Sequence, residues 1–136
     1  MSNAEDFTRI ANELKQAADS GDLDALRNVY ATDAVIWHNV DDTEKTVEES
    51  LKFLGALRAV TTRTWYADQR LTLTENGFVL QHYTGAELKS GEELSIPSAL
   101  IVTVKDGKIS RLEEYIESNA AAPAFAALAA LSQAAE

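Results

Sequence analysis

The sequence predicts an α+β fold, with helices in the first part of the chain and an antiparallel β-sheet in the second. Apolar residues recur every three to four positions as far as Leu57. After Val60 their period changes to two, which is the spacing of a strand with one buried face. Turn sequences divide this second part, so its strands should form consecutive hairpins. Helices followed by such a meander are typical of helices packed on one face of a sheet.

Two helices are expected in the first thirty residues. The first ends at Ser20-Gly21, because glycine readily adopts the left-handed conformation that closes a helix. Asp22 follows and can cap a shorter second helix through its side-chain oxygen. The apolar positions of the two helices are Phe7, Ile10, Ala11, Leu14, Ala17, Ala18, Leu23, Leu26, Val29 and Tyr30.

A strand and a third helix are expected next. Residues 34–40 are rich in β-branched and aromatic side chains and predict the strand, whereas the polar residues 41–45 predict a loop. Thr46, with Glu49 three positions later, matches the capping box that begins a helix. The apolar positions of this third helix are Val47, Leu51, Leu54 and Leu57.

Three turn signals separate four expected strands in the second part of the chain. Asn76-Gly77 is the strongest short hairpin signal, and Lys89-Ser90-Gly91 and Asp106-Gly107 mark the other two turns. The expected strands are residues 62–75, 78–88, 94–105 and 108–117.

Residues 1–118 are expected to form one domain, and residues 119–136 an alanine-rich tail. Pro123 fits the first turn of a helix, so a helical tail and a partly frayed end are both compatible with this composition. A chain of 136 residues can bury a core without disulfides or metal.

Composition excludes several classes of function. A net charge of −10 disfavours nucleic acid and anionic membranes as partners, because no basic patch can contact phosphates. The absence of cysteine excludes thiol catalysis and thiolate metal sites. Residues 1–6 do not resemble a signal peptide, and no apolar run is long enough to span a membrane, so a cytoplasmic location is expected.

The order of elements and three local segments resemble the nuclear transport factor 2-like superfamily, in its SnoaL-like and ketosteroid isomerase branches. The segments are residues 30–35 (YATDAV), 107–109 (GKI) and 114–117 (EYIE), and the resemblance covers about residues 5–118. It implies a cone-shaped curved antiparallel sheet wrapped around three N-terminal helices, with an apolar pocket inside. Family members usually form homodimers through the outer face of the sheet, where alternate apolar residues of 71–73, Val79 and 102–104 are expected.

The resemblance does not extend to a known set of catalytic residues. His38 aligns with the catalytic aspartate of ketosteroid isomerases, while Ala99 and Leu14 align with their two oxyanion donors and cannot donate a hydrogen bond. Ketosteroid isomerase activity is therefore not expected. Glu114 matches the last-strand acid of limonene epoxide hydrolases, but the strand 78–88 lacks their arginine and second acid.

The alternation of strand side chains, anchored on this resemblance, places His38, His82 and Glu114 in the pocket as candidate catalytic residues. Alternation leaves either Glu113 or Glu114 on the inner face, and each histidine could instead be a structural residue. Two histidines and a carboxylate can bind zinc, but their spacing matches no recognised metal motif, so no metal or cofactor is expected. The expected substrate-binding residues at the pocket wall or mouth are Trp37, Asn39, Tyr66, Tyr83 and Ser98.

Two functions are compatible with this site. The first is a small cofactor-free enzyme that uses acid/base chemistry to isomerise, cyclise or add water to a small apolar molecule. The alternative is a non-catalytic module that binds a small apolar ligand or serves dimerisation. Convergence of the three candidate side chains around an open cavity would favour the enzyme, and a cavity filled by side chains would favour the alternative.

Overall fold

The computed structural model describes residues 3–134 and confirms the α+β class, with helices and one six-stranded sheet. None of the helices in this described part is long and apolar enough to cross a membrane. The elements in chain order are α1 Ala4–Ser20, α2 Leu23–Val29, β1 Tyr30–His38, β2 Thr43–Lys45, α3 Val47–Val60, β3 Thr61–Thr74, β4 Gly77–Leu88, β5 Glu93–Lys105, β6 Lys108–Ile116 and α4 Ser118–Ala134.

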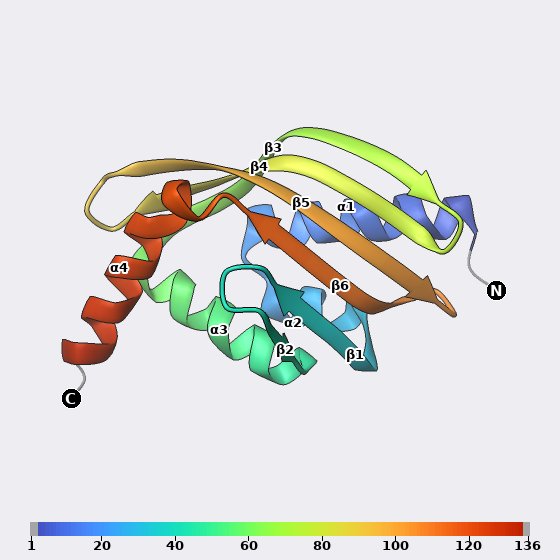
Figure 1. Cartoon of the computed structure of the whole chain (residues 1–136), viewed down its shortest axis with the longest axis horizontal. Helices are drawn as coiled ribbons and strands as arrows, with labels where there is room; N and C mark the ends of the chain where they lie inside the picture. Colours follow the sequence, from blue (N-terminus) through green and yellow to red (C-terminus); the bar gives the residue numbers. More distant parts are fainter. Residues whose placement is uncertain (1–2, 135–136) are drawn as a thin grey trace.

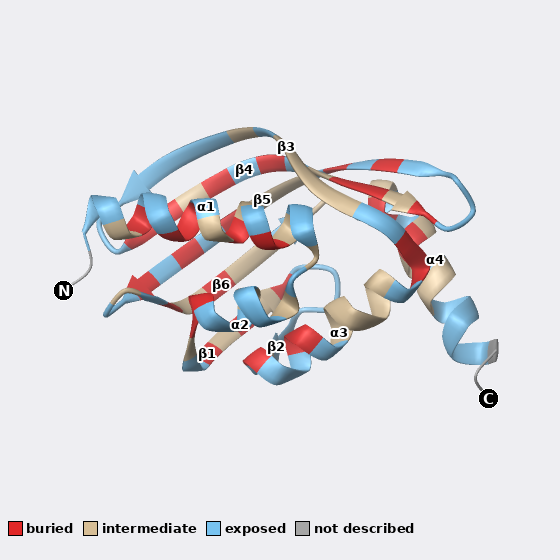
Figure 2. Ribbon diagram, turned by 180° about the vertical axis from the view of Figure 1, so that it is seen from behind, coloured by how far each residue is buried: buried red, intermediate tan, exposed pale blue. Residues whose placement is uncertain are grey.

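The sheet curves over the helices. Its strand order is β2-β1-β6-β5-β4-β3, in which β3 to β6 form the expected antiparallel meander and β1 runs parallel to β6. Figure 1 shows β3 to β6 arching over α1, α2 and α3, and Figure 2 shows α1 lying along the inner face from the other side. The helices therefore occupy the concave side of the sheet, as the resemblance implied.

Capping groups lie where the sequence predicted at the end of α1 and at the starts of α2 and α3. Thr46 and Glu49 form both hydrogen bonds of a capping box at α3, and the Asp22 carboxylate accepts from the backbone of Ala25 at α2. Gly21 closes α1 in the left-handed conformation with φ = 78°. These contacts satisfy backbone groups that a helix end leaves unpaired.

The strand β1 begins earlier than expected. Tyr30 was assigned to the second helix, but it is the first residue of β1, with φ = −91° and ψ = 145°. It pairs with Ile109 of β6, so its backbone hydrogen bonds belong to the sheet and α2 ends at Val29. The end of the strand was also misplaced, because β1 stops at His38 and does not reach Val40.

The prediction of a loop at residues 41–45 was partly wrong. Thr43–Lys45 form the short strand β2, which pairs antiparallel with residues 36–38 of β1. It is an edge strand, and Thr43 and Glu44 are exposed. An exposed strand needs no alternation of apolar and polar residues, so the pattern that reveals other strands is missing here.

The hairpin at Asn76-Gly77 is confirmed, although its turn lies one residue earlier than expected, at Glu75 and Asn76. Gly77 is the first residue of β4 and pairs with Thr103. A Cβ atom at this position would lie 1.9 Å from the carbonyl oxygen of Val102. The close approach of β5 therefore requires glycine here.

Buried residues form two clusters. In the larger one, apolar side chains of α1 such as Ile10 and Leu14 pack against the inner face of the sheet. In the smaller one, Ala121 and Ala124 of α4 pack against Leu88 and Ile96 of the sheet. The alanine-rich segment is thus a packed helix as far as it is described, whereas a domain boundary at residue 118 stays a prediction.

Candidate active site

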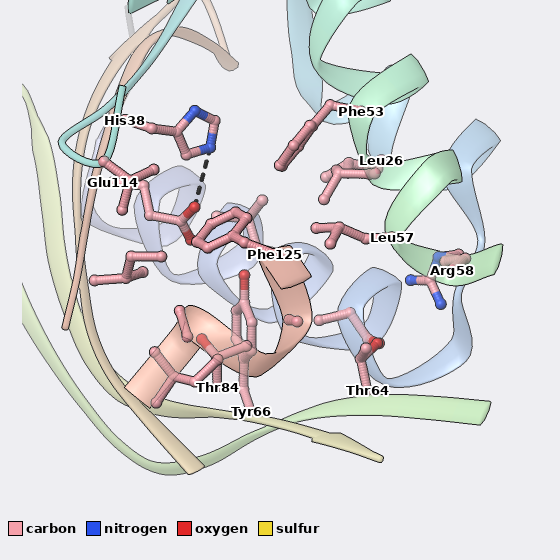
Figure 3. A pocket seen from close by; sticks show the side chains of 18 of the residues that line it. Leu26, His38, Phe53, Leu57, Arg58, Thr64, Tyr66, Thr84, Glu114 and Phe125 are labelled. Atoms are coloured by element: carbon pink, nitrogen blue, oxygen red, sulfur yellow. Dashed lines mark hydrogen bonds and ion pairs between the residues drawn. The ribbon is translucent and has the colours of Figure 1, made fainter. Parts of the chain in front are cut away.

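A cavity of about 180 Å³ lies between the inner face of the sheet and the helices α1, α2, α3 and α4. Figure 3 shows side chains from both sides converging on it. Most of its lining is apolar, which lowers the local dielectric constant and strengthens polar interactions inside. The larger apolar residues that line it are Leu14, Leu26, Phe53, Leu54, Leu57, Ile96, Ile116 and Phe125.

His38 and Glu114 form a pair within this cavity. They lie opposite each other on the parallel strands β1 and β6, so their side chains emerge on the same face. The His38 Nε2 atom lies 3.0 Å from Glu114 Oε1, and the two side chains are 11% and 22% exposed. A proton can pass directly between groups at this distance. Glu113 points to the outer face, where Arg111 Nη2 lies 3.4 Å from its Oε2 atom.

Tyr66 of β3 adds a hydroxyl group to the same region. Figure 3 shows its side chain rising from the sheet with the hydroxyl directed toward Glu114. Burial, and after it the negative charge of Glu114, raises the pKa of Tyr66 above its usual range. The phenol therefore stays protonated at neutral pH and remains a hydrogen-bond donor.

His82 does not meet Glu114, contrary to expectation. It lies on β4, and β5 separates β4 from β6, a spacing of roughly 10 Å. The ring of Tyr66 stacks on its imidazole with 4.0 Å between centroids. The His82 Nε2 atom lies 3.1 Å from Thr84 Oγ1, and no hydrogen bond joins His82 to Glu114 in residues 3–134. Burial lowers the pKa of His82, against the opposing effect of Glu114, so its imidazole is neutral at neutral pH.

Two of the expected substrate-binding residues lie on the outer face of the sheet. Trp37 packs edge-on against Tyr115 with 5.1 Å between centroids, and its indole N–H donates to Asp42 at 2.9 Å. Tyr83 is 43% exposed. Both are sequence neighbours of the inward-facing histidines, and alternation turns them the other way. Neither side chain is among those that line this cavity.

Asn39 and Ser98 have structural partners instead of facing the cavity. The Asn39 amide donates to the backbone carbonyl of Ile116 and accepts from its N–H, which joins the ends of β1 and β6. Ser98 lies 2.8 Å from the hydroxyl of Thr84 and donates to the carbonyl of Ile96. Of the five expected substrate-binding residues, Tyr66 alone lines the main cavity in the described part of the chain.

The sequence analysis missed several residues that line the cavity. Phe53 and Arg58 of α3 face it, as does Phe125 of α4. Helical spacing from Leu51 and Leu54, seven and four residues earlier, could have indicated Arg58, but a charged residue on such a face is normally assigned to solvent. Phe125 was given no role, because the alanine-rich composition of residues 119–136 left the structure of this segment open. Lys45 also borders the cavity, where its ammonium lies 2.6 Å from Asp41.

The described residues contain no group of three or more histidine, aspartate or glutamate side chains placed to hold a metal ion. His38, His82 and Glu114 do not form the two-histidine, one-carboxylate set, since His82 is held behind Tyr66.

Comparisons with known proteins agree with this architecture. A family model, described as the SnoaL-like domain, matches residues 11–112. PrhC from Penicillium brasilianum is 13% identical, with a TM-score of 0.82 over 96% of this chain and 93% of PrhC. A protein provisionally assigned as a polyketide cyclase from Xanthomonas campestris is 19% identical, with a TM-score of 0.78 over 87% and 95%.

A third solved structure includes a small molecule. This protein from Catenulispora acidiphila has a ketosteroid isomerase-like fold and was solved in complex with trimethylamine. It is 14% identical, with a TM-score of 0.70 over 78% of this chain and 83% of that one. A search of curated proteins found no significant match.

Proposed function

Since the chain belongs to the SnoaL-like domain family, we propose that it is an enzyme that isomerises or cyclises a small apolar carbonyl compound by acid/base catalysis. The observation that carries the proposal is the His38–Glu114 pair, with 3.0 Å between Nε2 and Oε1, inside a largely apolar cavity. The relatedness to proteins provisionally assigned as polyketide cyclases supports the same class of reaction.

Glu114 acts as the general base in this proposal. Its carboxylate removes a proton from the carbon next to the substrate carbonyl, and the electron pair of the broken C–H bond forms a C=C bond. The π electrons of the carbonyl move to its oxygen and give an enolate. A positioned general base of this kind typically accelerates proton transfer by about 10²- to 10⁴-fold.

Tyr66 stabilises the charge that develops on the enolate oxygen. Its hydroxyl faces the region of Glu114, and the raised pKa keeps the donor proton on the phenol. A donor that is fixed in place before the reaction loses no energy to reorientation when the charge appears.

His38 completes the cycle by exchanging the proton with Glu114. In an isomerisation the proton returns to a different carbon of the same molecule. In a cyclisation the enolate carbon attacks a second carbonyl of the folded substrate, and the new alkoxide takes up the proton. Neither route requires a group beyond the residues named here.

The experiment follows deuterium incorporation into 2-tetralone, an apolar ketone with an acidic α-carbon, in D₂O by NMR. The protein should accelerate exchange above the buffer rate, and Glu114→Gln should lower this acceleration about 10²- to 10⁴-fold. Glu113→Gln provides the matched control, since this carboxylate lies near Arg111 on the outer face and should leave the rate unchanged.

The same experiment distinguishes the alternative function. Binding of 2-tetralone with exchange at the buffer rate would contradict catalysis and support a non-catalytic ligand-binding module. One structural neighbour was solved in complex with trimethylamine, which supports binding of a small molecule by this fold even without catalysis.

We also propose that the protein acts in the cytoplasm as a homodimer. Apolar residues on the outer face of the sheet, including Ile101 at 40% exposure and Tyr115 at 42%, support an interface there.

A further inference from the structure

Arg58 differs from the other charged residues that line the cavity. Lys45 and Asp41 neutralise each other at 2.6 Å, and Glu114 lies beside His38. Arg58 forms no ion pair with any acidic side chain in residues 3–134. It is therefore a cation without a counterion on the wall of an apolar cavity.

The hydrogen bonds of Arg58 are also incomplete. Its Nη2 group donates to the carbonyl of Ala17 over 3.4 Å, and its buried Nε atom has no partner among the described residues. Burial lowers the pKa of this guanidinium, and no neighbouring carboxylate raises it. Removing a charge and its donors from water without a partner costs free energy. Such a cost is commonly found where a ligand supplies the missing partner.

The position of Arg58 separates it from the proposed catalytic pair. Figure 3 shows Arg58 on one side of the cavity, beside Thr64 and Leu57, and Glu114 with His38 on the opposite side. The lining between them includes apolar residues, among them Leu26. A ligand that fills the cavity would contact a cation at one end and the carboxylate at the other.

We propose that Arg58 binds a carboxylate carried by the substrate at the end remote from the reacting carbonyl. This inference rests on the proposed function and names the substrate class: an apolar keto acid with the two groups at opposite ends. The planar guanidinium matches a carboxylate with two parallel hydrogen bonds. Glu114 repels a carboxylate from its own end, so the two charges together fix the direction in which the substrate binds.

A purely structural role makes a different prediction. Arg58 lies near the C-terminus of α1, where a cation is favoured by the helix dipole, and its side chain covers Gly21. If that were its whole purpose, replacing Arg58 would lower the stability of the fold and leave ligand selectivity unchanged.

The test compares 2-naphthoate with its neutral amide, 2-naphthamide, by isothermal titration calorimetry. The wild-type protein should bind the carboxylate more tightly than the amide, on the order of tenfold. Arg58→Gln should abolish this preference, while Arg58→Lys, which keeps the charge but loses the planar fork, should retain part of it. Arg63→Gln is the matched control, because this substitution removes the same charge from a residue that does not line the cavity. Arg63 packs over the ring of Trp65 at 4.3 Å.

Equal affinity of the wild-type protein for the two compounds would overturn the proposal. So would a preference that persists in Arg58→Gln, or a loss of stability in that variant with selectivity intact. Glu114→Gln separates this proposal from the catalytic one, since it should keep the preference for 2-naphthoate. A protein that shows the preference but no deuterium exchange would retain the carboxylate site and lack the proposed activity.

Discussion

Tyr66 lies between two of the candidate catalytic residues predicted from the sequence, because its ring stacks on His82 while its hydroxyl points toward Glu114. Tyr66→Phe keeps the ring and removes the donor. We expect the rate of 2-tetralone exchange to fall about 10²-fold while affinity for the ketone changes little. Tyr83→Phe, on the exposed outer face, is the control and should leave the rate unchanged.

The pH dependence of exchange gives an independent check on Tyr66. An ordinary tyrosine ionises near pH 10, and ionisation would destroy the donor. Because the pKa of Tyr66 is raised, the Tyr66-dependent part of the rate should persist through about pH 10. Loss of this part at lower pH would contradict the assignment.

The buried imidazole of His82 should make the folded protein less stable in weak acid. Its pKa is lowered in the folded protein, so below about pH 6.5 the unfolded chain binds a proton that the folded imidazole does not. Its contribution to stability is therefore full above that pH and declines as the pH falls. We expect His82→Phe, which can keep the stack on Tyr66, to lose less stability on acidification than the wild type.

Urea denaturation at about pH 7.5 and about pH 5.5 measures this effect as the difference between the two proteins, so titration of the carboxylates largely cancels. Variant and wild type that lose stability in parallel would show that His82 ionises equally in both states.

At the scale of single elements, close strand packing makes Gly77 the sharpest test of the sheet. A Cβ atom there would meet the carbonyl of Val102 at 1.9 Å, which β4 and β5 can relieve only by separating. We expect Gly77→Ala to lower the free energy of unfolding by about 3 kcal/mol, measured by urea denaturation.

The control is Gly55→Ala in α3, where the new methyl group would have its nearest neighbour at 3.8 Å. This change should stabilise the protein by about 0.5–1 kcal/mol, since alanine favours a helix more than glycine does. A mild effect of Gly77→Ala would mean that the two strands are farther apart at this point.

Elements that carry their own signal could be predicted from the sequence, and those that depend on neighbours could not. The capping box at Thr46 and the apolar period of the meander are local features and gave the correct helix and strands. Tyr30 fits either a helix or a strand, and only pairing with Ile109 decides between them. The strand β2 is polar and at the edge, so no pattern distinguishes it from a loop.

In the candidate site, too, local features could be predicted from the sequence and features that depend on tertiary packing could not. Alternation indicates which face of a strand carries a side chain, and the structure places Glu114 inside and Glu113 outside. It does not indicate how far apart inward residues lie, so the distance between His82 and Glu114 could not be anticipated. The position of Arg58 depends on how α3 packs beside the end of α1, which is a tertiary property.

At the scale of the whole molecule, the curved sheet has an inner face covered by helices and an outer face that no part of residues 3–134 covers (Figure 1). The outer face carries Ile101, Tyr115 and Tyr83, which are 40%, 42% and 43% exposed. Val102 and Val104, by contrast, are buried in the inner core, so the expectation that they contribute to the outer face was wrong for these two residues.

This outer face is where we expect the homodimer to form. Burial of apolar side chains from several neighbouring strands would stabilise the pair, whereas a carboxylate placed among them would have to be desolvated. Ile101→Glu should therefore shift the protein to a monomer in light scattering at high micromolar concentration. Leu131→Glu is the matched control, because Leu131 is 43% exposed and belongs to the helix α4 instead of the outer face of the sheet, and this variant should remain a dimer. A wild-type protein that is monomeric under the same conditions would contradict the prediction, as would dissociation of both variants.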